Sequence, residues 1–127
     1  MSRKLTAMAV TLALLAALCL LEAHVVRRAT GEAMAQTQQI LADIRAGSLT
    51  QAKEKAHALD KTWDERASRL EIMVDHGSTD DVRYALSRLL AALEGEDRSA
   101  ALIYACELEG SVEHVYERQA FTLENML

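Results

Sequence analysis

Histidines and carboxylates gather at two places in the chain where they could act together. Asp75 and His76 stand at a predicted helix break, Asp80 follows shortly after, and Glu113 and His114 stand late in the last helical segment. Imidazole and carboxylate groups bind divalent transition metals, and histidine changes charge near neutral pH. Together these residues form a candidate metal or pH-sensing site. The alternative is structural: Asp75 and His76 cap a helix, His114 packs at a core edge, and the spacing matches no zinc signature.

A Glu-x-x-His pattern at Glu54 and His57 matches half of a di-iron site in a helical bundle. Such a site needs a second copy of the pattern and two further inward-facing glutamates. The chain has no second copy. We therefore expect His57 to lie on a solvated helix face.

The two cysteines are far apart, with Cys19 in an apolar run and Cys106 in the last helical segment. We do not expect them to pair with each other. Cys106 follows Ala105, a member of an apolar stripe, and is expected to pack as a small apolar residue. An intermolecular disulfide is the alternative if the body of the chain is exported.

The sequence contains no nucleophile elbow, no phosphate-cradling glycine loop and no Cys-x-x-Cys pair. Its acidic residues form no pair isolated among apolar residues, the arrangement that shifts one carboxyl pKa for acid–base catalysis. We therefore expect no enzymatic activity, no cofactor and no small-molecule substrate. The net charge of −5 also argues against a nucleic-acid partner, because nucleic-acid binders carry a basic face.

The composition is typical of an all-α protein. Of the 127 residues, 22 are alanine and 19 are leucine, whereas 4% are aromatic and none is proline. Alanine and leucine favour helices, and proline breaks them. An all-β domain would need more β-branched and aromatic residues, with turns about every 8–12 positions.

Residues 5–21 form a run of 17 residues without a charged side chain. As a helix this run would be roughly 26 Å long, near the lower limit for crossing a bilayer core. Ala17 and Cys19 are the best pair for signal peptidase, but bulky Leu20 and Leu21 follow, and no lipoprotein box precedes Cys19. We expect residues 1–22 to be an uncleaved signal-anchor, with a cleaved export signal or a buried helix as alternatives.

Charges on both sides of this run bear on its orientation. Arg3 and Lys4 favour a cytoplasmic N-terminus, whereas Arg27 and Arg28 beyond the run favour the opposite. We expect a single-pass protein of the cell membrane with a cytoplasmic N-terminus and with its body, residues 23–127, outside. Residues 22–127 carry 12 Lys and Arg against 19 Asp and Glu, a charge of −7 that anionic lipid repels.

Apolar residues recur in steps of three and four through the body, the period of an amphipathic helix. The steps predict helices over 23–46, 49–74, 79–94 and 98–118, the first of them continuous with the membrane run. Each of the three breaks contains a glycine: Gly47, Gly77 and Gly95. The side chains expected to form the structural core are Trp63, Leu70, Leu86, Leu89, Leu108 and Val112.

Short connections make consecutive helices antiparallel neighbours, which predicts an antiparallel three- to four-helix bundle. This topology places Trp63 opposite small Ala33, and Ser78 and Asp97 are candidate N-caps. It also brings the corner at 75–76 and the end of the last helix close to the lipid, where an apolar tail would emerge. So small and alanine-rich a body has a thin core, and we expect a second copy or a membrane-protein partner to complete it.

Several short motifs form a recognisable set: Trp63, Val74-Asp75-His76, Leu86 with Arg88-Leu89, residues 108–114, and the ending Leu-Glu-Asn-Met-Leu at 123–127. In this set the chain resembles a bacterial family of short single-span proteins known as a domain of unknown function. The resemblance extends from the anchor to the C-terminus and implies a membrane-anchored helical protein with no assigned reaction. Gly77-Ser78-Thr79 departs from the acidic and aliphatic residues expected after the histidine of that family.

The sequence thus favours a membrane-anchored helical interaction or scaffold protein with an extracytoplasmic body. A first alternative is an extracytoplasmic metal- or pH-sensing module that uses Asp75, His76, Glu113 and His114. A second alternative is a secreted helical protein released by signal cleavage.

Overall fold

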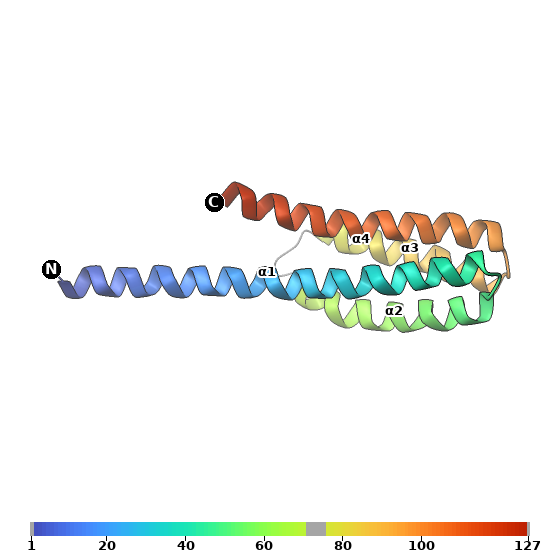
Figure 1. The fold of residues 1–127 in the computed structure, drawn as a ribbon, viewed down its shortest axis with the longest axis horizontal. Coiled ribbons are helices and arrows are strands. Elements are labelled where there is room, and N and C mark those ends of the chain that lie inside the picture. The colour runs from blue at the N-terminus through green and yellow to red at the C-terminus, as the bar shows by residue number, and fades with distance from the viewer. Residues whose placement is uncertain (1, 71–75, 127) are drawn as a thin grey trace.

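The computed structural model describes residues 2–70 and 76–126, and these ranges contain four helices (Figure 1). They are α1 (Ser2–Arg45), α2 (Leu49–Leu70), α3 (His76–Glu94) and α4 (Arg98–Met126). Short connections join α1 to α2 and α3 to α4. The predicted all-α fold is confirmed.

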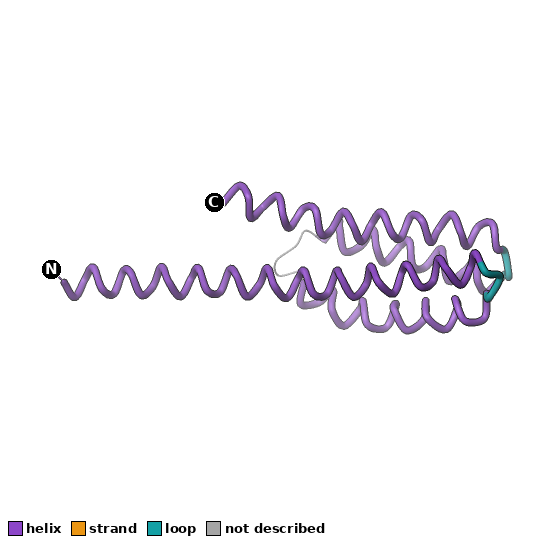
Figure 2. The backbone as a smooth tube through the Cα atoms, in the orientation of Figure 1, coloured by secondary structure: helices purple, strands orange, loops and turns teal. Residues whose placement is uncertain are grey.

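The helices form an antiparallel bundle in which each packs against two neighbours. α1 and α3 each contact both α2 and α4. The α1–α2 and α3–α4 turns lie together at one end, which we call the distal end (Figure 2). At the opposite, proximal end, α1 and α4 extend beyond α2 and α3 (Figure 1).

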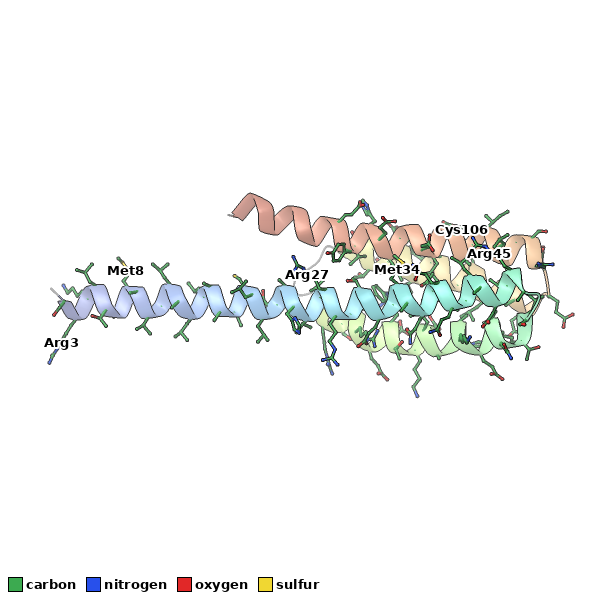
Figure 3. All side chains as sticks on the ribbon, viewed as in Figure 1. Arg3, Met8, Arg27, Met34, Arg45 and Cys106 are labelled. Carbon is green, nitrogen blue, oxygen red and sulfur yellow. The ribbon has the colours of Figure 1, made fainter. Side chains whose placement is uncertain are left out.

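α1 is one unbroken helix of 44 residues that includes the whole apolar run. Its N-terminal half projects from the bundle alone, with side chains directed outward all round (Figure 3). This helix is long and apolar enough to cross a membrane, and only 11% of its most apolar 18-residue window is buried in protein. Because such an apolar surface is poorly solvated by water, the exposed half of α1 is a candidate membrane span.

The core is built from one stripe of each helix. On α1 the apolar period is continued into the body by six buried residues: Val26, Thr30, Ala33, Thr37, Ile40 and Ile44. The hydroxyls of Thr30 and Thr37 donate to carbonyls one turn earlier, those of Val26 and Ala33, at 2.8 and 2.7 Å. Their burial therefore leaves neither hydroxyl unsatisfied.

Trp63 is the largest fully buried side chain, and its indole links two helices. The indole N–H of this α2 residue donates to the carbonyl of Thr79 on α3 at 3.3 Å. Ala33, which the antiparallel register places opposite Trp63, is also fully buried. The other expected core residues that are buried are Leu86, Leu89, Leu108 and Val112. Leu70 ends α2, and its side chain lies outside the described part of the structure.

The α1–α2 turn has a helix ending that requires glycine. Gly47 has a φ of 80°, a left-handed conformation that costs an L-residue energy but not glycine. The N–H of Gly47 donates to the carbonyl of Ile44, and that of Ser48 donates to the carbonyl of Asp43. These two bonds form a Schellman motif, which satisfies carbonyls that the end of α1 would otherwise leave unpaired.

The α3–α4 turn has the same Schellman motif, but its left-handed residue is the one after Gly95. Glu96, not Gly95, is the residue with positive φ, at 53°. The N–H groups of Glu96 and Asp97 donate to the carbonyls of Leu93 and Ala92. Asp97 then caps α4, because its carboxylate accepts from the N–H of Ala100 at 3.1 Å.

Two helix bounds differ from the sequence prediction. α3 begins at His76 rather than at residue 79, so Ser78 is not an N-cap but a buried residue within the first turns. α4 continues to Met126 instead of ending at 118, because no glycine or proline follows Gly110 to stop it. The expected tail is therefore helical, and the predicted end of the second helix at 74 lies outside the described residues.

Candidate functional site

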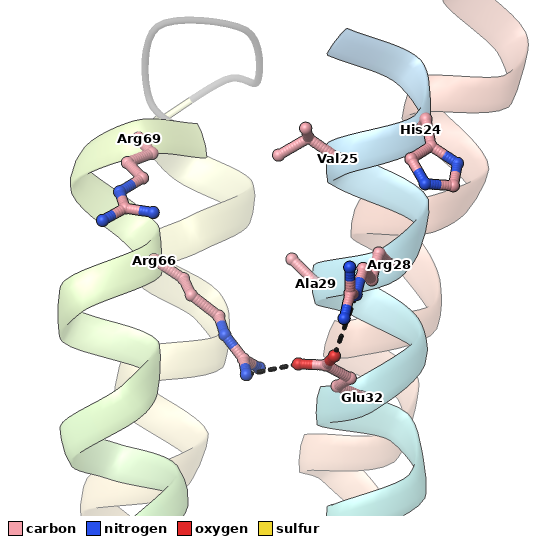
Figure 4. A pocket seen from close by; sticks show the side chains of 7 residues that line it. All are labelled: His24, Val25, Arg28, Ala29, Glu32, Arg66 and Arg69. Atoms are coloured by element: carbon pink, nitrogen blue, oxygen red, sulfur yellow. Dashed lines mark hydrogen bonds and ion pairs between the residues drawn. The ribbon is translucent and has the colours of Figure 1, made fainter. Parts of the chain in front are cut away.

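A candidate site is the groove between α1 and α2 at the proximal end of the bundle (Figure 4). Its volume is about 390 Å³, and seven residues line it: His24, Val25, Arg28, Ala29, Glu32, Arg66 and Arg69. The first five come from three successive turns of α1, and the two remaining arginines come from the last two turns of α2. We call this feature the arginine groove.

Glu32 lies between two of the arginines. Its carboxylate accepts from Arg28 Nε at 3.4 Å and from Arg66 Nη2 at 2.5 Å (Figure 4). The second terminal nitrogen of Arg66, Nη1, is buried and has no hydrogen-bond partner among the described residues. This carboxylate thus pairs with two of the three arginines, and the described lining of the groove carries a surplus of positive charge.

The wall of the groove on α1 is apolar. Val25 and Ala29 occupy successive turns of α1 and point toward α2 (Figure 4). Val25 is 41% exposed, although the valine next to it, Val26, is fully buried in the core. The groove therefore combines an apolar wall with a cationic rim, which suits a ligand that is partly apolar and partly anionic.

Of the predicted metal-site residues, the structure describes the side chains of Asp80, Glu113 and His114, and these three lie in different surroundings. Asp75 lies outside the described residues, and His76 begins α3. Asp80 is paired with Arg83 on the same helix, at 3.1 Å, and Arg83 also reaches Asp64 of α2 at 3.2 Å. Asp80 is therefore engaged in a surface ion-pair network that joins α2 to α3.

Glu113 and His114 are both exposed on α4. Glu113 contributes to a small pocket of about 180 Å³ against α1, beside Arg27 and Tyr116. No group of three or more histidine, cysteine, aspartate or glutamate side chains suited to a metal occurs among the described residues. Because Asp75 is not among them, the site formed by Asp75, His76, Glu113 and His114 stays a prediction.

His57 of the Glu-x-x-His pattern on α2 belongs to an ion-pair cluster at the surface. Glu54 and His57 are both exposed. Glu94 of α3 lies 3.0 Å from Lys53 Nζ and 3.6 Å from His57 Nε2. The hydrogen bond and charge of Lys53, with a smaller contribution from His57, lower the pKa of Glu94 below its ordinary value.

Cys106 is exposed on α4, contrary to the expectation that it packs as a small apolar residue. Ala105 beside it is fully buried. One step along a helix turns the side chain by about 100°, which takes Cys106 off the buried stripe. Cys19 is also exposed, on the apolar half of α1.

Sequence reasoning did not find the arginine groove. In the sequence, Arg28 bears on the orientation of the chain and lies in a region expected close to the lipid, whereas no motif marks Arg66 or Arg69. The available signal was their spacing, because positions 66 and 69 lie one turn apart on the α2 side that the antiparallel register brings to residues 25–32. The predicted register, which places Trp63 opposite Ala33, already brings these positions to one level. The structure is needed to show which of their side chains face one groove.

Fold and site together define a class of protein: an antiparallel four-helix bundle whose first helix extends into a candidate membrane span. The family model described as Domain of unknown function (DUF4363) matches residues 20–126, which is most of the chain. The chain belongs to this family, which confirms the resemblance to a family of unknown function. No curated protein and no solved structure matches the chain.

Proposed function

We propose that this chain is a membrane-anchored scaffold whose bundle lies on the outer side of the cell membrane. There the bundle engages a membrane-protein partner or a second copy of this chain. The continuity of α1 is the observation that supports this role, because one helix forms both the candidate span and a wall of the bundle. A bundle attached in this way is held at a fixed height and angle above the bilayer. Such a fixed position favours binding and positioning of a partner over a catalytic role.

The proposal assigns the N-terminus to the cytoplasm and the bundle to the outer side. Cys106 provides a test of this assignment, because its thiol is exposed on α4. In intact cells, a membrane-impermeant maleimide is expected to label Cys106 as fully as in lysed cells. A Cys106→Ser variant is the control for labelling elsewhere, and labelling only after lysis would place the bundle in the cytoplasm.

The anchor itself is tested by extraction and by mass. The full chain is expected to stay in the membrane fraction in alkaline carbonate, and its mature mass is expected to include residues 1–22. Release of a shorter chain would instead support the secreted helical protein.

The partner is tested by crosslinking the full-length protein in its native membrane, followed by purification and mass spectrometry. We expect one reproducible membrane protein or a crosslinked dimer of this chain. A control chain in which an unrelated apolar span replaces residues 5–21 should retain a partner that binds the bundle. Recovery of neither product would contradict the scaffold role.

A further inference from the structure

If α1 spans the bilayer, the end of the arginine groove at His24 and Arg69 lies at the depth of the lipid headgroups. The uncharged run ends at Leu21, so at 1.5 Å per residue His24 lies roughly 5 Å beyond it and Arg28 roughly 10 Å beyond it. The headgroup layer extends about 5–8 Å beyond the hydrocarbon core on each side. Arg28 and Arg66 bond to Glu32, roughly 16 Å beyond the run. Arg69, on the last turn of α2, lies nearer the run, and its long side chain is within reach of phosphates.

An apolar stripe leads from the groove into the apolar half of α1. Leu14, Leu18, Leu21 and Val25 follow one another at steps of four, three and four, which places them on one helix face. Each is more than 40% exposed, and Val25 also lines the groove. One face of α1 therefore offers an apolar surface that ends at a cluster of arginines.

Among the described residues, the cations that line the groove outnumber the carboxylates that pair with them. Of the described residues that line it, Glu32 is the one carboxylate, against Arg28, Arg66 and Arg69. Arg69 has no hydrogen bond or ion pair with any described residue, and Arg66 Nη1 is buried without a partner there. Guanidinium groups present paired N–H donors that match the oxygens of a phosphate.

We propose that the arginine groove binds the headgroup phosphate of one anionic phospholipid, with an acyl chain along Leu14, Leu18, Leu21 and Val25. The inference rests on the membrane anchoring proposed above. The apolar stripe selects a lipid over free phosphate, and the surplus of arginines selects an anionic headgroup over a zwitterionic one. The groove would thus attract an anionic lipid through its local positive charge, although the net charge of the chain is negative.

The test uses the full chain in a non-ionic detergent, with bound lipid counted by native mass spectrometry. Phosphatidylglycerol is expected to bind at one molecule per chain, about tenfold more tightly than phosphatidylcholine. Inorganic phosphate at the same concentrations is expected neither to bind nor to displace the lipid. Equal binding of the two lipids would overturn the proposal, and so would displacement of phosphatidylglycerol by inorganic phosphate.

Two variants assign the effect to the groove. Arg28→Gln with Arg69→Gln is expected to reduce the preference for phosphatidylglycerol to near unity. The matched control, Arg45→Gln with Lys61→Gln, removes the same charge at exposed positions outside the groove and should keep the preference. Equal loss in both double variants would show that only net charge matters and would contradict the site.

A third variant, Glu32→Gln, is expected to change the affinity for phosphatidylglycerol in the opposite direction from the arginine double variant. This test does not require the double variant to fold. Removing this carboxylate frees Arg28 and Arg66, so phosphatidylglycerol should bind more tightly than in the wild-type protein. Unchanged or weaker binding would contradict the proposal. Carbonate extraction of the same variants separates the two hypotheses: a chain that stays in the membrane without lipid preference refutes this site alone, and a released chain refutes the anchor.

Discussion

Glu96 occupies a backbone conformation that glycine adopts more easily. Its φ of 53° lies in the left-handed region, although Gly95 is its immediate neighbour. The position is the residue after the end of α3 in a Schellman motif, where glycine is most common. The energy of this conformation is therefore a cost that the present sequence carries.

Replacing Glu96 by glycine is expected to raise the free energy of unfolding by about 1 kcal/mol, because glycine has no Cβ to clash in this conformation. Urea unfolding followed by circular dichroism measures the change. Glu96→Gln is the matched control, since it removes the charge and keeps the Cβ, and it should leave the stability nearly unchanged. A destabilised glycine variant would contradict this assignment.

Glu94 gives a residue-level prediction about pH. Its pKa is lowered in the folded state, so its ion pair with Lys53 stabilises the fold above the ordinary carboxyl pKa near 4.5. This contribution is lost as the pH falls through the lowered pKa. Lys53→Met is expected to raise the pKa of Glu94 toward its ordinary value, measured by NMR titration of the carboxyl carbon.

The same substitution should also lower the stability of the fold. Near pH 7 the Lys53→Met variant should be less stable than the wild-type protein, and the difference should shrink as the pH is lowered through the acid range. Lys61→Met, at an exposed α2 position with no ion pair among the described residues, is the control. An unchanged Glu94 pKa in Lys53→Met would show that the pair does not form in solution.

At the scale of elements, one side chain joins the two halves of the bundle at the distal end. Arg98 begins α4, and it donates to the carbonyls of Ile44 and Arg45 at 3.1 and 2.6 Å. These carbonyls belong to the last turn of α1, where acceptors lack partners within the helix. The α3–α4 hairpin thus helps to cap the first helix.

Arg98→Ala is expected to lower the free energy of unfolding by about 1–2 kcal/mol, because charged hydrogen bonds to helix-end carbonyls are lost. Arg88→Ala is a suitable comparison, since Arg88 forms an exposed ion pair with Glu107 at 2.6 Å. Exposed pairs contribute little, so that variant should change stability by less than about 1 kcal/mol. Equal effects of the two substitutions would contradict a special role for Arg98.

The elements were largely predictable because their determinants are local. Steps of three and four gave the core stripe of α1, and Gly47 gave the first turn. The start of α3 was not predictable in this way. Ser78 has the residue type of a cap, but it is buried beside Thr79, whose carbonyl accepts from Trp63. Residue type alone does not distinguish a capping serine from one that tertiary packing encloses.

The arginine groove was beyond prediction for a different reason. Its cations come from α1 and α2, at positions 38 or more residues apart, and each alone resembles an ordinary surface arginine. The predicted register brings them to one level, but only the arrangement of the side chains in the structure shows that they line one groove. A site made by packing becomes visible when the packing is known, whereas a site made by one motif is visible in the sequence.

At the scale of the whole molecule, the continuity of α1 predicts that span and bundle share one direction. Inserting four glycines between Leu21 and Glu22 should uncouple them, because glycine is a poor helix former. In oriented bilayers, the infrared dichroism of the amide I band is expected to fall in this variant. Insertion of four alanines, which continue the helix, should preserve it, and a similar loss in both variants would contradict rigid coupling.

The same continuity makes α1 a lever. If its apolar half spans the bilayer, the helix extends 24 residues beyond Leu21 to Arg45, roughly 36 Å, and a change in tilt of about 10° would move the distal turns sideways by about 6 Å. Helices tilt when bilayer thickness changes. Any protein that contacts the distal turns would therefore experience a thinner or thicker membrane as a displacement, without a change in shape of the bundle.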